Sequence, residues 1–135
     1  MKQAKMKNQE EKDNKIKVLV VDDEPDIVDI FYTHLTKKGY NVDVVLSGKA
    51  ATENAKKKKY DVTFLDLKMP GLDGAQTCQQ LAKIDPNNKI ILITGYGSEV
   101  DHMKKTAFKA GALKCIDKPF NLGRIVCAIE EAMKS

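Results

Sequence analysis

The feature that most constrains the fold is a regular alternation of short apolar runs with longer segments of helical periodicity. Five apolar runs predict buried strands, at residues 16–21, 42–46, 62–65, 89–93 and 113–116. Helical patterns fill the intervals, at residues 26–38, 49–59, 74–84, 100–110 and from 122 to the chain end. Strands that alternate with helices in this way predict an α/β domain, in which right-handed crossovers build a parallel sheet covered by helices on both faces.

Local signals support several helix boundaries. Pro25 precedes the first helical segment, where a missing backbone N–H costs little, and Gly39 and Gly111 follow the first and fourth segments as helix stops. The four consecutive lysines 56–59 indicate a solvated helix end, where positive charge is favourable. The last segment has an apolar stripe that we assign to the core: Leu122, Ile125, Val126, Ile129 and Met133.

Length and composition limit the protein class. A chain of 135 residues fits one domain, and 42% apolar with 31% charged residues is typical of a soluble protein. No stretch approaches the roughly 20 apolar residues of a membrane span, and the N-terminus lacks the apolar core of a secretory signal. We therefore expect a cytoplasmic protein without a membrane role. Three cysteines without a Cys-x-x-Cys pair argue against disulfides and zinc, and we expect them to act as small buried hydrophobes.

The positive charge is concentrated at the N-terminus. The chain carries net +4, of which residues 1–17 hold +3, with six lysines against three acids. A lysine-rich segment without large apolar side chains predicts a flexible basic tail at residues 1–14, followed by a folded domain at 15–135. Because no aromatic residues interleave the lysines, direct nucleic-acid binding is not expected.

Three carboxylates follow two of the predicted strands. Asp66 ends the run at 62–65, and Asp22 and Asp23 follow the run at 18–21. The strand order 2-1-3-4-5, that of the flavodoxin-like doubly wound fold, suits a five-stranded domain and brings the ends of strands 1 and 3 together at its ligand-binding edge. Such a cluster requires a proton or a cation, and oxygen ligands with open water positions favour Mg²⁺.

Two further strand ends supply groups that suit a phosphoryl group. Thr94 follows the run at 90–93 and offers a hydroxyl, and Lys118 follows the run at 113–116 and offers a compact cation. Each residue alone is unremarkable, but five such groups at the ends of four strands indicate a site for phosphate chemistry.

As a set, these residues resemble the receiver domain of bacterial two-component response regulators. The resemblance covers about residues 15–135 and includes DLKMPGLDG from Asp66 and KPF from Lys118; the string ITGYGS from Ile93 is similar to receivers of the nitrogen-regulator type. It implies that Asp66 is the phosphoacceptor and that Thr94 and Lys118 contact the phosphoryl group. It also implies Mg²⁺ held by Asp22, Asp23, Asp66 and the main-chain carbonyl of Lys68.

The resemblance further implies partners and a mode of output. A sensor histidine kinase or phosphotransfer protein would donate the phosphoryl group, and a downstream protein effector would bind the fourth helix, fifth strand and fifth helix. That surface has five basic residues that could receive an acidic partner: Lys104, Lys105, Lys109, Lys114 and Arg124.

The sequence also departs from the family pattern. Cys115 stands where receivers often have an aromatic switch residue, which puts that switch in doubt, and Tyr96 offers an alternative aromatic near Thr94. Lys68 and Tyr96 flank the positions that admit water to the phosphoryl group, so they should influence its lifetime. The bond between Lys118 and Pro119 is cis or trans, and the sequence does not choose between them.

Other function classes fit less well. A haloacid-dehalogenase-type phosphatase also uses an aspartate nucleophile, but it needs a second acid where Lys68 stands. A flavodoxin-like electron carrier needs a phosphate-cradling loop where Asp22 and Asp23 would repel the phosphate. We therefore expect a phosphoacceptor and binding module rather than an enzyme, either a single-domain regulator or a receiver excised from a longer protein.

Overall fold

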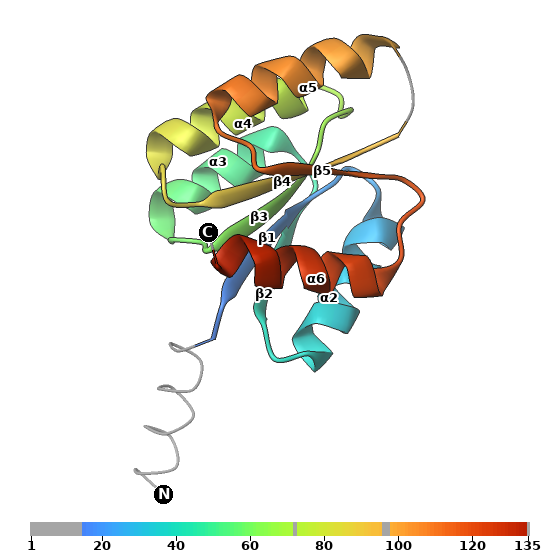
Figure 1. Cartoon of the computed structure of the whole chain (residues 1–135). Coiled ribbons are helices and arrows are strands. Elements are labelled where there is room, and N and C mark those ends of the chain that lie inside the picture. Colours follow the sequence, from blue (N-terminus) through green and yellow to red (C-terminus); the bar gives the residue numbers. More distant parts are fainter. Residues whose placement is uncertain (1–14, 72, 96–97, 135) are drawn as a thin grey trace, which may run out of the picture.

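The structure is a computed structural model that describes residues 15–134, apart from residues 72, 96 and 97. Strands and helices alternate along the chain (Figure 1). The strands are β1 (Lys17–Val21), β2 (Asn41–Val45), β3 (Val62–Asp66), β4 (Lys89–Thr94) and β5 (Lys114–Asp117). The helices are α2 (Pro25–Lys37), α3 (Gly48–Lys57), α4 (Gly74–Ile84), α5 (Ser98–Ala110) and α6 (Leu122–Met133).

The five strands form one parallel sheet in the order β2-β1-β3-β4-β5. This confirms the predicted flavodoxin-like topology. Helices α2 and α6 cover one face, and α3, α4 and α5 cover the other (Figure 1). Because successive side chains of a strand point to opposite faces, Val18 and Val20 pack in the core beneath α2 and α6, whereas Leu19 and Val21 pack in the core on the other face.

Aromatic packing joins the loop after β5 to the core. Phe31 of α2 packs against Phe64 of β3 and Phe120, with ring centroids 5.3 and 5.2 Å apart. Phe120 directly precedes the cap of α6, Asn121, whose side chain accepts a hydrogen bond from the N–H of Arg124. These contacts fix the entry of α6, and with it the short segment that holds Lys118 and Pro119.

The observed element ends differ from the predicted ones by at most two residues among the described residues, but some side-chain predictions were wrong. Met133, which we assigned to the core with the rest of the α6 stripe, is 41% exposed. Of the three cysteines only Cys78 is buried; Cys115 is half-buried and Cys127 is exposed on the outer side of α6. In the lysine run 56–59, Lys56, Lys57 and Lys59 are exposed as predicted, whereas Lys58 is half-buried and forms a 3.0 Å ion pair with Asp43 of β2.

Two other predictions concern membrane-spanning segments and the N-terminal tail. Among the described residues, none of the helices is long and apolar enough to cross a membrane. The basic tail predicted at residues 1–14 lies outside the described residues.

Candidate functional site

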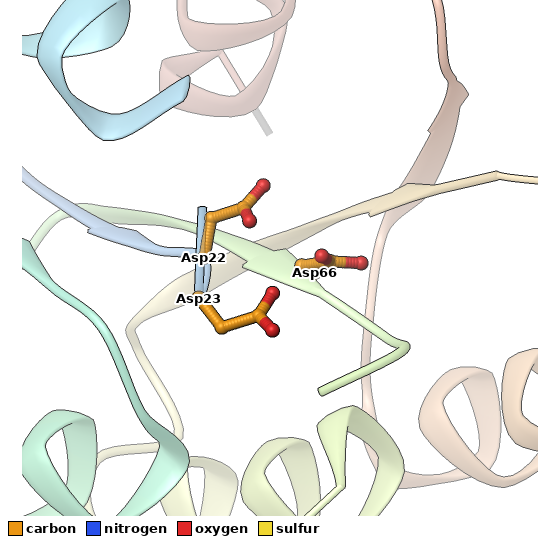
Figure 2. A group of neighbouring side chains, drawn as sticks. All are labelled: Asp22, Asp23 and Asp66. Carbon is orange, nitrogen blue, oxygen red and sulfur yellow. The ribbon is translucent and has the colours of Figure 1, made fainter. Parts of the chain in front are cut away.

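Three carboxylates meet at the carboxyl edge of the sheet (Figure 2). Asp22 and Asp23 follow β1, and Asp66 is the last residue of the neighbouring strand β3. One oxygen from each side chain lies within 4.8 Å of one from each of the other two, and Asp23 is the most accessible of the three. Their oxygens fit the donor set that Mg²⁺ prefers, and the accessible side leaves room for water ligands.

Lys118 lies against two of these acids. Its Nζ donates hydrogen bonds to Oδ2 of Asp22 at 3.0 Å and to Oδ2 of Asp66 at 3.3 Å. Asp22 is fully buried and Asp66 is 3% exposed, so both interactions are shielded from water. The structure therefore brings four predicted site residues into one cluster.

Backbone groups hold the two buried carboxylates in place. The N–H of Glu24 donates to Oδ1 of Asp22 at 3.0 Å, and the N–H of Lys68 donates to Oδ1 of Asp66 at 3.1 Å. In each acid, Oδ1 thus accepts a hydrogen bond from the backbone N–H two residues later, and Oδ2 accepts one from Lys118. This division of roles fixes the orientation of both carboxyl groups.

Charge and burial set the protonation of the cluster. Burial and the nearby charge of Asp22 raise the pKa of Asp66 to about 6, although Lys118 and the Lys68 N–H act in the opposite direction. Burial disfavours the charge of Lys118, but its hydrogen bonds and attraction to Asp22 and Asp66 outweigh this effect and raise its pKa. Near neutral pH the site therefore holds an ionised Asp66 beside a charged lysine.

Thr94 lies at the same edge of the sheet, but its side chain forms a hydrogen bond outside the acid cluster. Its backbone pairs with β5, and the N–H of Lys118 donates to its carbonyl at 2.7 Å. The Thr94 side chain is fully buried, and its hydroxyl donates to the carbonyl of Gly95 at 3.2 Å. Within the described part of the chain, this hydroxyl forms no hydrogen bond with Asp66 or Lys118.

Three other sequence-based predictions have different outcomes. The peptide bond between Lys118 and Pro119 is cis, which decides the alternative that the sequence left open. Lys68 is exposed beside Asp66, and ligation through its main-chain carbonyl remains a prediction. Tyr96, the alternative aromatic, lies outside the described residues.

Sequence reasoning missed one contributor to the site. Gly74, the first residue of α4, donates its N–H to the carbonyl of Leu67 at 2.9 Å, and an added Cβ there would lie 2.5 Å from the Asp66 carbonyl oxygen. The sequence pattern there predicted only that a helix begins at residue 74.

Comparison with known proteins agrees with this geometry. The family model for the response regulator receiver domain matches residues 18–130, which include all the predicted site residues. The chain belongs to the response regulator receiver family. Receiver domains are signalling modules of two-component systems that bind Mg²⁺ at an acidic pocket, which corresponds here to Asp22, Asp23 and Asp66. The match does not support the phosphatase alternative.

Two relatives differ in how much of their own length the receiver domain makes up. The chain is 36% identical over 119 residues to chemotaxis protein CheY of Thermotoga maritima, covering 87% of this chain and 98% of that one. It is 32% identical over 121 residues to the transcriptional regulatory protein ResD of Bacillus subtilis, covering 90% of this chain but only 49% of ResD.

Solved structures share the fold closely. A CheY-like receiver domain protein from Methanospirillum hungatei superposes with a TM-score of 0.80 at 26% identity, covering 90% of this chain and 98% of that one. NtrX from Brucella abortus also gives 0.80, at 28% identity, but this chain, 89% of which is covered, spans only 27% of NtrX. The receiver fold therefore occurs both alone and within longer regulators.

Proposed function

We propose that this receiver domain accepts a phosphoryl group on Asp66 from a histidine kinase or phosphotransfer protein in a Mg²⁺-dependent reaction. The observation that carries the proposal is the position of Lys118 Nζ, which contacts Asp66 and Asp22 while Asp23 completes the acid cluster. The site thus combines an ionised nucleophile, a fixed cation and a set of metal ligands.

The chemistry requires little beyond positioning and charge neutralisation. An Asp66 carboxylate oxygen attacks the phosphorus of a phosphohistidine, the new O–P bond forms as the P–N bond breaks, and the imidazole leaves with the electron pair. Because the pKa of Asp66 is about 6, the carboxylate is mostly ionised at pH 7 and needs no general base. Lys118 offsets the charge that a phosphoryl oxygen brings to this buried edge.

Asp22, Asp23, Asp66 and the main-chain carbonyl of Lys68 would hold Mg²⁺, which supplies positive charge to the phosphoryl oxygens. Thr94 has a separate role. Its hydroxyl now donates to the Gly95 carbonyl, and it can exchange that acceptor for a phosphoryl oxygen. This exchange would couple phosphorylation of Asp66 to the segment after β4.

The output surface consists of α5, β5 and α6, where a downstream protein effector would bind. The basic residues predicted there differ in availability: Lys105, Lys109 and Arg124 are exposed, whereas Lys104 and Lys114 form ion pairs with Asp117 and Glu131. An acidic partner would therefore compete with two internal ion pairs. We place the receiver domain at residues 15–135 and its site of action in the cytoplasm.

A small phosphodonor tests the assignment. Acetyl phosphate with Mg²⁺ should add one phosphoryl group to the protein, detected by intact mass, and Asp66→Ala should abolish the addition. Asp73→Ala is the matched control, since Asp73 caps α4 in the same loop and its loss should leave labelling intact. Labelling of the Asp66→Ala variant would disprove the proposal.

A further inference from the structure

Lysines gather at the end of the molecule opposite Asp66. In this topology the helices end where the strands begin, at the left and bottom of Figure 1. We call this end the basic pole and define it as residues 15–17, 34–41, 54–62, 81–89, 107–114 and 130–134. It holds thirteen lysines: Lys15, Lys17, Lys37, Lys38, Lys56, Lys57, Lys58, Lys59, Lys83, Lys89, Lys109, Lys114 and Lys134.

The charge separation is large for a domain of this size. The basic pole has four acids against its thirteen lysines, net +9, whereas the rest of residues 15–134 carries net −6. Strands of five residues put the two ends at least about 17 Å apart, about twice the Debye length at physiological salt. The acid cluster around Asp66 therefore does not cancel the positive field of the basic pole.

Internal pairing accounts for few of these lysines. Within the described part of the chain, the side chain of Lys58 pairs with Asp43 and that of Lys114 with Glu131, and the side chains of the other eleven form no ion pair with a carboxylate. Lysines near the end of a helix can be explained by their favourable interaction with the helix dipole. Of the thirteen lysines, however, only five lie in helices and eight lie outside them. The surplus positive charge is therefore available to an external anion.

Two features of the basic pole indicate the kind of anion. Its charged cations are all lysines, which act as point charges toward anionic groups and do not need the bidentate geometry by which arginine recognises one phosphate. It also contains three partly exposed apolar side chains, Phe108 at 43%, Leu113 at 46% and Met133 at 41%. Hydrated lysines interspersed with apolar side chains suit a lipid surface, which offers both anionic headgroups and an apolar interior.

We propose that the basic pole binds the surface of anionic lipid membranes, with the Asp66 site facing away from the lipid. This departs from the sequence-based expectation of no membrane role, which rested on the absence of a spanning segment; surface binding needs none. The proposal is independent of the phosphorylation chemistry, because Asp22, Asp23, Asp66 and Lys118 lie at the other end of the sheet.

Co-sedimentation of the full chain with vesicles tests this proposal. The protein should bind vesicles of phosphatidylcholine and phosphatidylglycerol at low salt, and it should bind pure phosphatidylcholine at least about tenfold more weakly. Charge reversal of Lys56, Lys57 and Lys59 together should weaken binding by more than about tenfold. The matched control reverses Lys49, Lys105 and Arg124, which are exposed outside the pole. This control has the same net charge and should retain binding.

An apolar pair of variants separates lipid from other polyanions. Leu113→Gln should weaken vesicle binding and leave binding to duplex DNA or polyglutamate unchanged, whereas Leu46→Gln, 48% exposed after β2, should change neither. Circular dichroism checks folding, and the milder change of the three lysines to Gln replaces the reversal if that variant unfolds. Equal loss in both charge variants, tighter binding to DNA or polyglutamate than to vesicles, or no vesicle binding by the parent protein would each overturn the proposal.

Discussion

The Nζ atom of Lys118 lies 3.3 Å from Oδ2 of Asp66, and it also donates a hydrogen bond to Oδ2 of Asp22. The positive charge of Lys118 thus interacts with two buried carboxylates and offsets the repulsion between them. Neither acid can be considered alone, because removing the lysine exposes each carboxylate to the full charge of the other.

Loss of Lys118 should therefore affect both stability and protonation. We expect Lys118→Met to lower the free energy of unfolding by about 1–3 kcal/mol at pH 7, because the fully buried Asp22 loses a charged hydrogen-bond partner. The pKa of Asp66 should rise above its present value of about 6. Urea denaturation measures the first effect, and a carboxyl NMR titration measures the second.

Lys105→Met provides the control, since Lys105 is exposed on α5. Its substitution should change the free energy of unfolding by less than about 0.5 kcal/mol. Equal stability of the Lys118 and Lys105 variants would show that Lys118 does not neutralise the cluster.

The raised pKa of Asp66 predicts a pH-dependent cost of folding without metal. The pKa of Asp66 in the folded protein is about 6, above the ordinary aspartate value of 3.8. The folded protein therefore binds the proton more tightly than the unfolded chain. It loses stability as pH rises from about 4 to about 6, and the loss is complete above pH 6.

Asp66→Asn removes this titration. In the absence of Mg²⁺, the variant should be about as stable as the parent at pH 4 and more stable by about 1–3 kcal/mol at pH 7. Thermal and urea unfolding across this pH range, with EDTA present, provide the measurement. A difference between the two proteins that does not change with pH would contradict the assigned direction of the Asp66 pKa shift.

The sequence predicted the topology because the signals are local and repeated. The runs at 18–21 and 62–65 each precede an acid, and parallel strands bring their carboxyl ends to one edge. The contact between Lys118 and Asp22 spans 96 positions, so it depended on the fold rather than on local pattern. From this topology alone, Asp22, Asp23, Asp66 and Lys118 are expected to lie together, as they do in the structure.

Side-chain environments were harder to predict because they depend on neighbours that are distant in sequence. Cys127 is exposed although it lies between Val126 and Ala128, because it is on the face of α6 opposite the buried Ile125 and Ile129. The prediction that it is buried rested on residue type and not on its position in the helix. Asp43 holds Lys58 and accepts a 2.6 Å hydrogen bond from Tyr60, so a lysine in an apparently solvated run became part of a polar cluster. The need for a glycine at position 74 likewise depends on the close main chain of Asp66 and Leu67, which the local sequence does not reveal.

Gly74 should position the backbone around Asp66, the proposed phosphoacceptor. A Cβ at this position would overlap the Leu67 Cα and lie 2.5 and 2.8 Å from the carbonyl oxygens of Asp66 and Leu67. Because all three neighbours are main-chain atoms, the turn after Asp66 must shift to accommodate Gly74→Ala. We expect a loss of about 1–3 kcal/mol in the free energy of unfolding and at least about a tenfold slower reaction with acetyl phosphate.

Gly123→Ala is the matched control for that change. Gly123 also lies in the first turn of a helix, α6, but an added Cβ there would meet only the Asn121 side-chain oxygen at 3.4 Å. Its substitution should leave stability unchanged or raise it by up to about 1 kcal/mol and leave phosphorylation unaffected. Amide NMR spectra separate positioning from simple destabilisation, because Gly74→Ala should shift the Asp66 and Lys68 signals in the folded protein, whereas Gly123→Ala should not. Wild-type phosphorylation kinetics in a folded Gly74→Ala protein would refute the positioning role.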